Sequence, residues 1–265
     1  MVAAPIGLIA NPASGKDIRR LVAHASTFDN AEKVNIVRRV LAGALAQGAK
    51  RFLYMRDEHD LVGAALDALR ERPDCEPLDT PFTGTPIDTE RAARAMREAG
   101  CGVVVSLGGD GTNRMIVRGW REAPLIAIST GTNNVFPLML EGTVAGAAAG
   151  LIAVGAVALT EVSTQAKRIA LTVEDEGDDL ALIDAALVAG AFAGTRAIWE
   201  VGGLRRIVLA RAEPAAVGLS AIGGLLEPIG ATDEGGLDLE LCSEAGADDV
   251  SGTVLRTLAP IAPGR

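Results

Sequence analysis

The sequence predicts an α/β N-terminal domain with a parallel, doubly wound sheet, followed by a β-rich C-terminal domain. The chain has 265 residues, of which 49% are hydrophobic and 22% charged, enough for one large core or two smaller ones. Short apolar runs alternate with helical patterns in the first half, which is typical of βα units. Short strand-like runs separated by turns fill the second half. We therefore expect domains at residues 1–142 and 143–265.

The expected elements of the first domain follow one another with short connections. Strands are expected at 6–10, 51–55, 75–78, 102–107 and 125–129, and helices at 31–47, 60–70, 89–99 and 112–119. Asp29 or Asn30 is expected to cap the first of these helices, and Asp88 the third. The uninterrupted apolar run at 102–107 indicates a strand buried on both faces. Alternation of this kind predicts parallel strands joined by crossover helices.

Residues 142–160 carry no charge, and 19 such residues are long enough to span a membrane. However, 11 of them are Ala or Gly, with small residues at every fourth position: Gly142, Gly146 and Gly150. We expect instead a helix whose small face lies close against a sheet, followed by a strand from about Val157. No membrane association is expected.

The second half predicts a sheet-dominated domain, because helical periodicity is weak there. Strands are expected at 161–173, 180–190, 196–201, 206–210 and 237–241. Acidic or glycine-bearing turns at 174–179 and 233–236 separate some of these runs.

Charge is divided unevenly along the chain, whose formal net charge is −9. Residues 1–140 hold 17 basic against 16 acidic residues (net +1), and residues 141–265 hold 8 against 18 (net −10). This balance argues against nucleic-acid binding, which depends on a basic face. A phosphate-bearing ligand would have to be held mainly by backbone amides, and the 31 glycines make that possible.

Several classes of site are excluded by counting. The three cysteines form no CxxC pair, which argues against a disulfide scaffold or a structural zinc site and favours a reducing compartment. The two histidines exclude a three-histidine metal site, and no GxSxG elbow is present. The N-terminus has no basic residue before its first apolar stretch, so we expect a cytoplasmic protein.

The strongest local motif is GGDGTN at 108–113, which directly follows the buried strand. Glycines permit left-handed backbone angles and let main-chain N–H groups approach an anion, and the following helix N-terminus favours phosphate. Among such amides an acidic residue is unfavourable unless it coordinates a cation or takes a proton, so Asp110 is the candidate functional residue. The alternative is an ordinary glycine-rich turn in which Asp110 caps the helix.

Two further polar loops, STGTNN at 129–134 and NPASGK at 11–16, follow expected strands. Parallel strands place these loops at the same edge of the sheet, where open α/β folds bind ligands. The spacing GxxxxGK[ST] of a P-loop is absent, and GxGxxG does not occur at the first turn, which argues against an ordinary Rossmann NAD site. The three loops together favour nucleotide or phosphate binding.

The combination NPASGKD (11–17), GGDGTN (108–113) and STGTNN (129–134) resembles the ATP-NAD kinase family, in particular its acetoin-catabolism protein X-like branch. The wider superfamily includes diacylglycerol and sphingosine kinases. The resemblance covers roughly residues 5–230 and implies an NAD kinase-like Rossmann variant joined to a β-rich domain. It implies a kinase, a nucleotide-binding transferase that uses ATP and Mg²⁺, and by default NADP biosynthesis from NAD.

The resemblance also assigns roles to residues. Asp110 would be catalytic, taking the proton from the acceptor hydroxyl during phosphoryl transfer. The residues that would bind nucleotide and phosphate are Asn11, Ser14, Gly15, Gly108, Gly109, Gly111, Thr112, Asn113, Thr130, Gly131, Thr132, Asn133 and Asn134. A homo-oligomer is implied, since NAD kinases complete their sites across subunits.

The acceptor site departs from the family pattern. NAD kinases carry an Asn-Glu or Asn-Asp pair in the second domain, and the corresponding pair here is Ile183-Asp184, so Asp184 is the candidate acceptor-binding residue. The segment 218–224 is a partial counterpart of a later Gly- and Ser-rich NAD-kinase segment. Two alternatives therefore stay open: a kinase acting on another small-molecule or lipid alcohol, and a non-catalytic nucleotide-binding accessory protein of acetoin catabolism.

Overall fold

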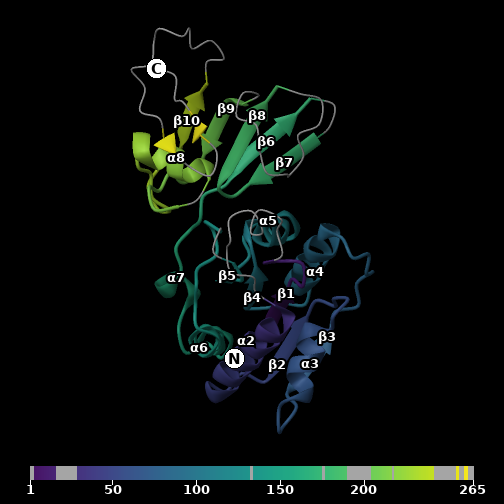
Figure 1. Ribbon diagram of the computed structural model, residues 1–265. Helices are drawn as coiled ribbons and strands as arrows, with labels where there is room; N and C mark the ends of the chain where they lie inside the picture. The colour runs from purple at the N-terminus through teal and green to yellow at the C-terminus, as the bar shows by residue number, and fades with distance from the viewer. Residues whose placement is uncertain are drawn as a thin grey trace, which may run out of the picture. The chain divides into compact units, whose positions relative to one another are not determined.

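The structure is a computed structural model (Figure 1). It describes residues 3–15, 29–131, 134–174, 177–189, 204–216 and 218–241, and the backbone of 255–256 and 260–261. The chain divides into two compact units, Met1–Thr164 and Gln165–Arg265. The boundary expected from the sequence was 142/143. The observed boundary comes later because the helix that begins at Gly142 packs within the first unit.

The first unit contains a five-stranded parallel sheet in the order β3-β2-β1-β4-β5, which confirms the predicted fold class. Its strands are β1 (Ile6–Ala10), β2 (Arg51–Tyr54), β3 (Asp74–Pro77), β4 (Val103–Gly108) and β5 (Leu125–Ser129). The central strand β1 pairs in parallel with both β2 and β4, with Ile6 opposite Phe52 on one side and Val103 on the other. All five residues of β1 and all six of β4 are buried, as expected for strands covered on both faces.

Helices cover both faces of this sheet. They are α2 (Asn30–Ala46), α3 (Leu61–Asp67), α4 (Pro86–Glu98), α5 (Asp110–Gly119) and α6 (Gly142–Ala153). One core cluster joins α2, α3 and α6 to the side chains of Ile6 and Leu8, and the other joins α4 and α5 to Ile9. Each fully buried large aliphatic side chain contributes about 1.5–3 kcal/mol, so these two layers fix the sheet in place.

The helix starts differ in part from those expected. Asp29 caps α2 as predicted, accepting the N–H of Glu32 at 2.7 Å. Asp88 does not cap α4. The N-cap is Thr85, and Asp88 lies in the first turn, where its carboxylate accepts the N–H groups of Thr83 and Gly84. The helix begins before residue 89 because Pro86 suits the first helical position.

The glycine stripe of α6 faces helix α2 and not the sheet, which corrects the expectation from the sequence. A Cβ on Gly146 would lie 2.0 Å from the backbone oxygen of Val40, and one on Gly150 would lie 2.8 Å from that of Ala44. The small residues therefore bring two helix backbones into close contact. No strand follows at Val157; the short helix α7 (Leu159–Val162) comes next. Among the described residues, no helix is long and apolar enough to cross a membrane.

The second unit is rich in β-strands, as predicted, and its sheets are antiparallel. Its elements are β6 (Ile169–Val173), β7 (Gly177–Ala181), β8 (Asp184–Val188), β9 (Leu204–Leu209), α8 (Leu219–Leu226), β10 (Leu237–Glu240), β11 (Leu255–Arg256) and β12 (Pro260–Ile261). The sheets are β10-β9-β8, β6-β7 and β11-β12. Leu209 and Ile222 lie in the core between β9 and α8. The strand expected at 161–173 starts only at Ile169, and the one expected at 196–201 lies outside the described residues.

Candidate functional site

The strand order places a topological switch point between β1 and β4. From β1 the chain continues to β2 and β3 on one side, whereas β4 and β5 lie on the other side. Open α/β sheets bind ligands at the carboxyl ends of the strands beside such a point. The loops that follow β1, β4 and β5 all leave the sheet at this edge, and they contain the three predicted motifs.

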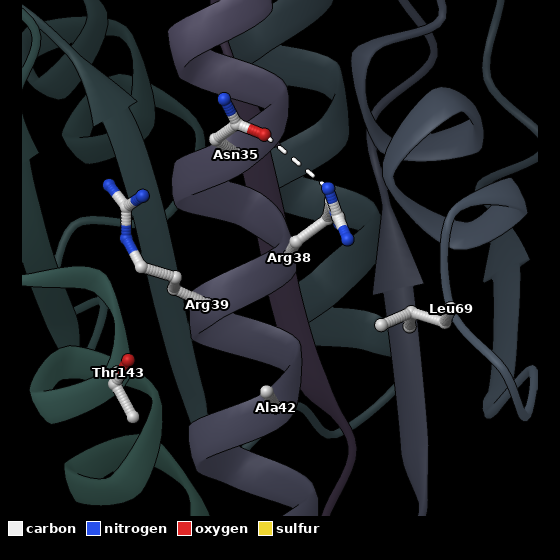
Figure 2. A pocket seen from close by; sticks show the side chains of 6 residues that line it. All are labelled: Asn35, Arg38, Arg39, Ala42, Leu69 and Thr143. Atoms are coloured by element: carbon white, nitrogen blue, oxygen red, sulfur yellow. Dashed lines mark hydrogen bonds between the residues drawn. The ribbon is translucent and has the colours of Figure 1, made fainter.

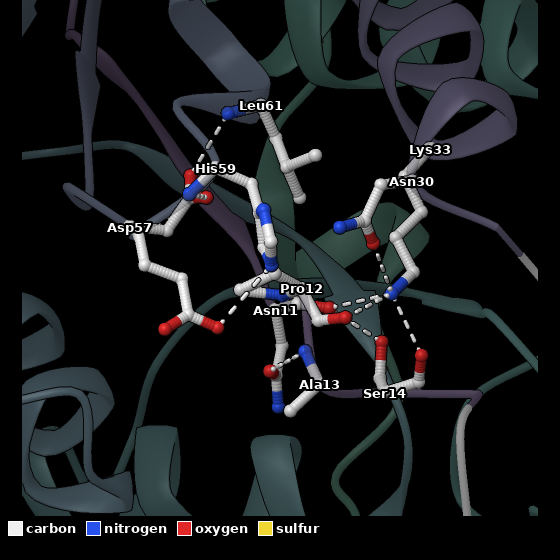
Figure 3. Close-up of polar contacts among 10 residues, drawn as sticks. Asn11, Pro12, Ala13, Ser14, Asn30, Lys33, Asp57, His59 and Leu61 are labelled. Atoms are coloured by element: carbon white, nitrogen blue, oxygen red, sulfur yellow. Dashed lines mark hydrogen bonds and ion pairs between the residues drawn. The ribbon is translucent and has the colours of Figure 1, made fainter.

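Asn11 makes several of the hydrogen bonds that hold the first loop (Figure 3). Its backbone N–H donates to the carbonyl of Leu107 on β4 at 2.9 Å, and its side-chain amide donates to Thr112 Oγ1 at 2.8 Å. Its amide oxygen accepts the N–H of Ala13 at 2.9 Å, and its backbone oxygen accepts the hydroxyl of Ser14 at 2.7 Å. Asn11 therefore fixes the loop after β1 to the start of α5.

Three glycines lie at the junction of β4 and α5: Gly108, Gly109 and Gly111. The first two leave room for neighbouring side chains and do not supply unusual backbone angles. A Cβ on Gly108 would lie 2.5 Å from Thr112, and one on Gly109 would lie 2.7 Å from Asn134 Oδ1. At Gly111 a Cβ would meet nothing within 4 Å. None of the three has a positive φ, which corrects the expectation of left-handed angles. Among the described residues of these loops, Gly15 has a positive φ, +79°. Gly111 is thus where the backbone is open to a ligand.

Asp110 is the first residue of α5, and Gly109 is the N-cap. The Asp110 carboxylate accepts the N–H of Phe136 at 2.8 Å and that of Val135 at 3.1 and 3.2 Å. Asp110 therefore does not cap its own helix but holds the chain that follows the third loop.

The side chain of Asn113 is fully buried, although the sequence predicts it to bind a ligand. Its amide oxygen accepts the hydroxyl of Ser106 at 2.7 Å, and its amide nitrogen donates to the Gly109 carbonyl at 2.9 Å. Both ends of the amide are thus used inside the protein. The arrangement indicates that Asn113 fixes the β4–α5 junction instead of contacting a ligand.

The third loop is tied to the first by a hydroxyl pair. The buried Thr130 donates to Ser14 Oγ at 2.7 Å, across 116 residues of sequence. Within the loop, the Asn134 amide donates to Ser129 Oγ at 2.8 Å and to the Gly131 carbonyl at 3.2 Å. Thr132 and Asn133 lie outside the described residues. The structure thus brings together the three loops that the sequence placed at one edge.

Sequence reasoning missed Lys33, which is fully buried in the first turn of α2. Its ammonium donates to the carbonyls of Asn11, Pro12 and Ser14 at 3.0, 2.9 and 2.7 Å (Figure 3). The signal was present in the sequence, because Lys33 lies on the same helical face as Ile36, Val37 and Val40, where a charge is out of place.

The loop after β2 lies at the same edge of the sheet. Asp57 accepts the N–H of His59 at 2.9 Å and that of Leu61 at 3.1 Å, which holds the start of α3 (Figure 3). Burial raises the pKa of the Asp57 carboxyl, although these hydrogen bonds and the nearby His59 oppose the shift. The carboxylate is engaged in its own turn, as in an ordinary Asx turn.

A hollow of about 290 Å³ lies elsewhere in the first unit, along the middle of α2 (Figure 2). Its lining residues are Asn35, Arg38, Arg39, Ala42, Leu69 and Thr143. None of them belongs to the three loops. Arg39 is paired with Glu32 at 2.9 Å and Glu141 at 3.2 Å, so its charge is balanced locally.

Asp184, the residue predicted to bind the phosphate acceptor, is the first residue of β8 in the second unit. It lies opposite Leu209 of β9. Its neighbour Ile183 is 4% exposed, and its carbonyl accepts the N–H of Ala210 at 2.8 Å. The residue that replaces the family's amide is therefore a buried aliphatic side chain. The segment 218–224 forms the start of α8, in which Ser220 is buried and donates to the Arg211 carbonyl at 2.9 Å.

Comparison with known proteins agrees with this division of the chain. The ATP-NAD kinase N-terminal domain family matches residues 6–156, and the acetoin catabolism protein X C-terminal domain family matches residues 167–265. Acetoin catabolism protein X of Cupriavidus necator is 40% identical over 274 residues, which cover 99% of this chain and 75% of that protein. The chain therefore belongs to the ATP-NAD kinase family, in the group that joins this kinase N-terminal domain to the C-terminal domain of acetoin catabolism protein X.

Proposed function

We propose that this chain is an ATP-dependent phosphotransferase whose default reaction is the phosphorylation of NAD to NADP. The observation that carries the proposal is the linkage of three loops around the open backbone of Gly111. Asn11 joins the first loop to Thr112, Thr130 joins the third to Ser14, and Asp110 holds the chain after the third. Such a preformed loop cluster at a switch point suits a nucleotide.

The residues present fit the phosphates of ATP. The first N–H groups of a helix have no partner within that helix, and those of α5 begin beside Gly111. Among the described residues there is no cluster of three or more His, Cys, Asp or Glu side chains that could hold a metal. Mg²⁺ would bind through the phosphate oxygens of the nucleotide, as is common at nucleotide sites. When bound, Mg²⁺ neutralises charge on the phosphates.

Asp110 is the proposed proton acceptor. The acceptor's hydroxyl oxygen forms a bond to the γ-phosphorus of ATP, the bond from that phosphorus to the bridging oxygen breaks, and ADP leaves. The hydroxyl proton passes to the Asp110 carboxylate. Because the N–H groups of Val135 and Phe136 fix this carboxylate, it reaches the reaction already oriented.

A second candidate is transfer to another alcohol, either a small metabolite or a lipid. The buried Ile183 favours it, because an aliphatic core residue cannot hydrogen-bond a dinucleotide as the family's amide does. The 40% identical relative is named for acetoin catabolism, and we place the second candidate in that context.

The test is direct. Purified protein is incubated with Mg²⁺, with ATP or polyphosphate as donor, and with NAD, and NADP is measured with a coupled dehydrogenase; Asp110→Ala is the control. NADP formation that disappears in the variant supports the proposal. Saturable ATP binding without formation of NADP would exclude NAD as acceptor. If the protein binds ATP but transfers phosphate neither to NAD nor to an added alcohol, a non-catalytic protein is favoured. Equal turnover in Asp110→Ala would remove Asp110 from the reaction.

We also propose that the chain works as a homo-oligomer, by its likeness to NAD kinases. Light scattering on the purified protein should give a multiple of the 27.2 kDa chain mass. A molar mass equal to one chain, with full activity, would contradict this.

A further inference from the structure

Two buried polar side chains, Ser106 and Asn113, join β4 to the start of α5. Both are 0% exposed. The Ser106 hydroxyl donates to the Asn113 amide oxygen at 2.7 Å, and the Asn113 amide nitrogen donates to the Gly109 carbonyl at 2.9 Å. The backbone N–H of Asn113 donates to the same carbonyl at 3.2 Å. Asn113 therefore connects the strand to the residue that precedes Asp110.

Packing alone does not require this polar pair. Ile116, one turn further along α5, already lies in the core cluster between this helix and the sheet. An alanine at position 106 and a leucine at position 113 would fill similar space without burying polar groups, which is costly unless they are hydrogen-bonded. A fully bonded buried pair instead fixes one geometry, because the amide offers a donor and an acceptor at a set separation.

The geometry that this pair fixes is that of Asp110. The Gly109 carbonyl belongs to the planar peptide that also contains the Asp110 nitrogen, so holding the carbonyl holds the plane from which the Asp110 side chain departs. A Cβ on Gly109 would lie 2.7 Å from Asn134 Oδ1, so this residue is closely packed against the third loop. The Asp110 carboxylate accepts the N–H of Phe136 at 2.8 Å. Asp110 is thus held at its backbone as well as at its carboxylate.

We infer that Asn113, supported by Ser106, is a positioning residue for Asp110. Acting through the Gly109–Asp110 peptide, it keeps the carboxylate aligned with the hydroxyl whose proton the carboxylate accepts. This inference rests on the proposed function. Proton transfer needs the two oxygens about 2.6–3.2 Å apart, so a small displacement of the carboxylate lowers the rate without removing a contact to ATP.

The experiment separates positioning of Asp110 from stabilisation of the fold. Asn113→Leu removes the amide, and the double variant Ser106→Ala/Asn113→Leu also removes the hydroxyl that would be left unpaired, which should recover stability. Asn113→Leu is also made in Asp110→Asn. Thr89→Val is the control, because Thr89 is buried on α4 and lies outside the three loops. Kinetics with ATP, Mg²⁺ and NAD give kcat and the KM of ATP, and urea unfolding gives stability.

We expect kcat to fall about tenfold to a hundredfold in Asn113→Leu and in the double variant, with the KM of ATP within about twofold of wild type. The fall in kcat should persist where the double variant recovers stability. In Asp110→Asn, adding Asn113→Leu should lower kcat no further, because it acts through that carboxylate. Thr89→Val should keep the wild-type kcat.

Three results would overturn the inference and leave the proposed function standing. They are a wild-type kcat in Asn113→Leu, a change in the KM of ATP alone, and an equal fall in kcat with and without the Asp110 carboxylate. If Asn113→Leu does not fold, Ser106→Ala decides, with an expected fall in kcat of about threefold that is absent in Asp110→Asn. A wild-type protein that forms no NADP would overturn both the inference and the proposed reaction.

Discussion

The two units hold their candidate site residues in different ways. In the first unit, Asn11, Asp110 and Thr130 each make a hydrogen bond that joins two of the three loops or the chain beside them. In the second unit, Asp184 stands at the start of an outer strand of its sheet, beside the buried Ile183. The first arrangement is fixed by side-chain hydrogen bonds between loops, whereas the second lies in the pairing of β8 with β9, where Asp184 is opposite Leu209.

In the function we propose, this difference separates the part that binds the phosphate donor from the part that binds the acceptor. The part of the chain with linked loops is the part that matches ATP-NAD kinases, and the remainder matches acetoin catabolism protein X. A preorganised phosphate site can serve many acceptors, because function depends on the site and not on the fold. We therefore expect changes in the first unit to affect phosphate chemistry and changes in the second to affect the choice of acceptor.

The largest effect is expected on kcat, and it should distinguish the carboxylate of Asp110 from that of Asp184. Asp110→Asn keeps the shape of the side chain but removes the proton acceptor, so kcat should fall by about 10²- to 10⁴-fold with little change in ATP affinity. Asp184→Asn should raise the KM of the acceptor and leave kcat nearly unchanged. Steady-state kinetics with the best acceptor checks both. A fall in kcat of equal size in the two variants would contradict the division.

The next largest effect is expected on the free energy of unfolding, when Ile183 is replaced. Ile183→Asn restores the residue type that NAD kinases carry, but it buries an amide in a core position that is 4% exposed. We expect a loss of about 2–4 kcal/mol in the free energy of unfolding and no gain in NAD affinity. Urea unfolding and NAD titration measure this, with Ile183→Val as a control that should lose about 1 kcal/mol. A stable Ile183→Asn protein with improved NAD binding would show that the side chain reaches the acceptor.

A smaller effect is expected from the link between the first and third loops. Thr130→Val removes the hydroxyl that donates to Ser14, which should cost about 1 kcal/mol of stability and raise the Kd of ATP a few-fold. Thr89→Val is the matched control: Thr89 is also buried, but its hydroxyl makes only a 3.7 Å contact with the sulfur of Met55. Equal ATP affinity in the two variants would mean that the link does not organise the site.

The smallest effect is a pH dependence specific to the first unit. Burial opposes ionisation of Asp88, but hydrogen bonds from Thr83, Gly84 and Thr85 outweigh it and lower the pKa from the ordinary 3.8. Its stabilising contribution is therefore complete above pH 3.8 and is lost as the pH falls through the lowered value. Asp88→Asn should cost about 1 kcal/mol at pH 7, and this gap should close at lower pH. A gap that stays constant down to pH 2 would contradict the assignment.

Much of the first unit could be predicted because its signals are local and agree with one another. The apolar run at 102–107 is followed at once by glycines, and β4 (Val103–Gly108) differs from the expected strand by one residue at each end. Parallel strands then place the loops at one edge, which the bonds of Asn11 and Thr130 confirm. Lys33 was missed because its partners are backbone carbonyls more than 18 residues away, which no sequence pattern specifies.

Other errors have a common cause, which is that a sequence does not say what a small residue packs against. Gly146 was expected to meet a sheet and instead meets α2, and Gly108 was assigned backbone freedom but makes room for Thr112. In the second unit, the sequence predicts no element at 219–226, where α8 forms, because short apolar runs do not distinguish a buried helix from a strand.

The most direct test of the central claim uses Gly111, where a side chain has room in the fold but would enter the proposed phosphate site. Gly111→Glu should fold with a Tm at or above that of the wild type, since an acid is favourable in the first turn of α5. Calorimetry with ATP and Mg²⁺ should show saturable binding to the wild type and none to the variant. Equal ATP affinity in the two proteins would contradict the claim that these loops hold the nucleotide.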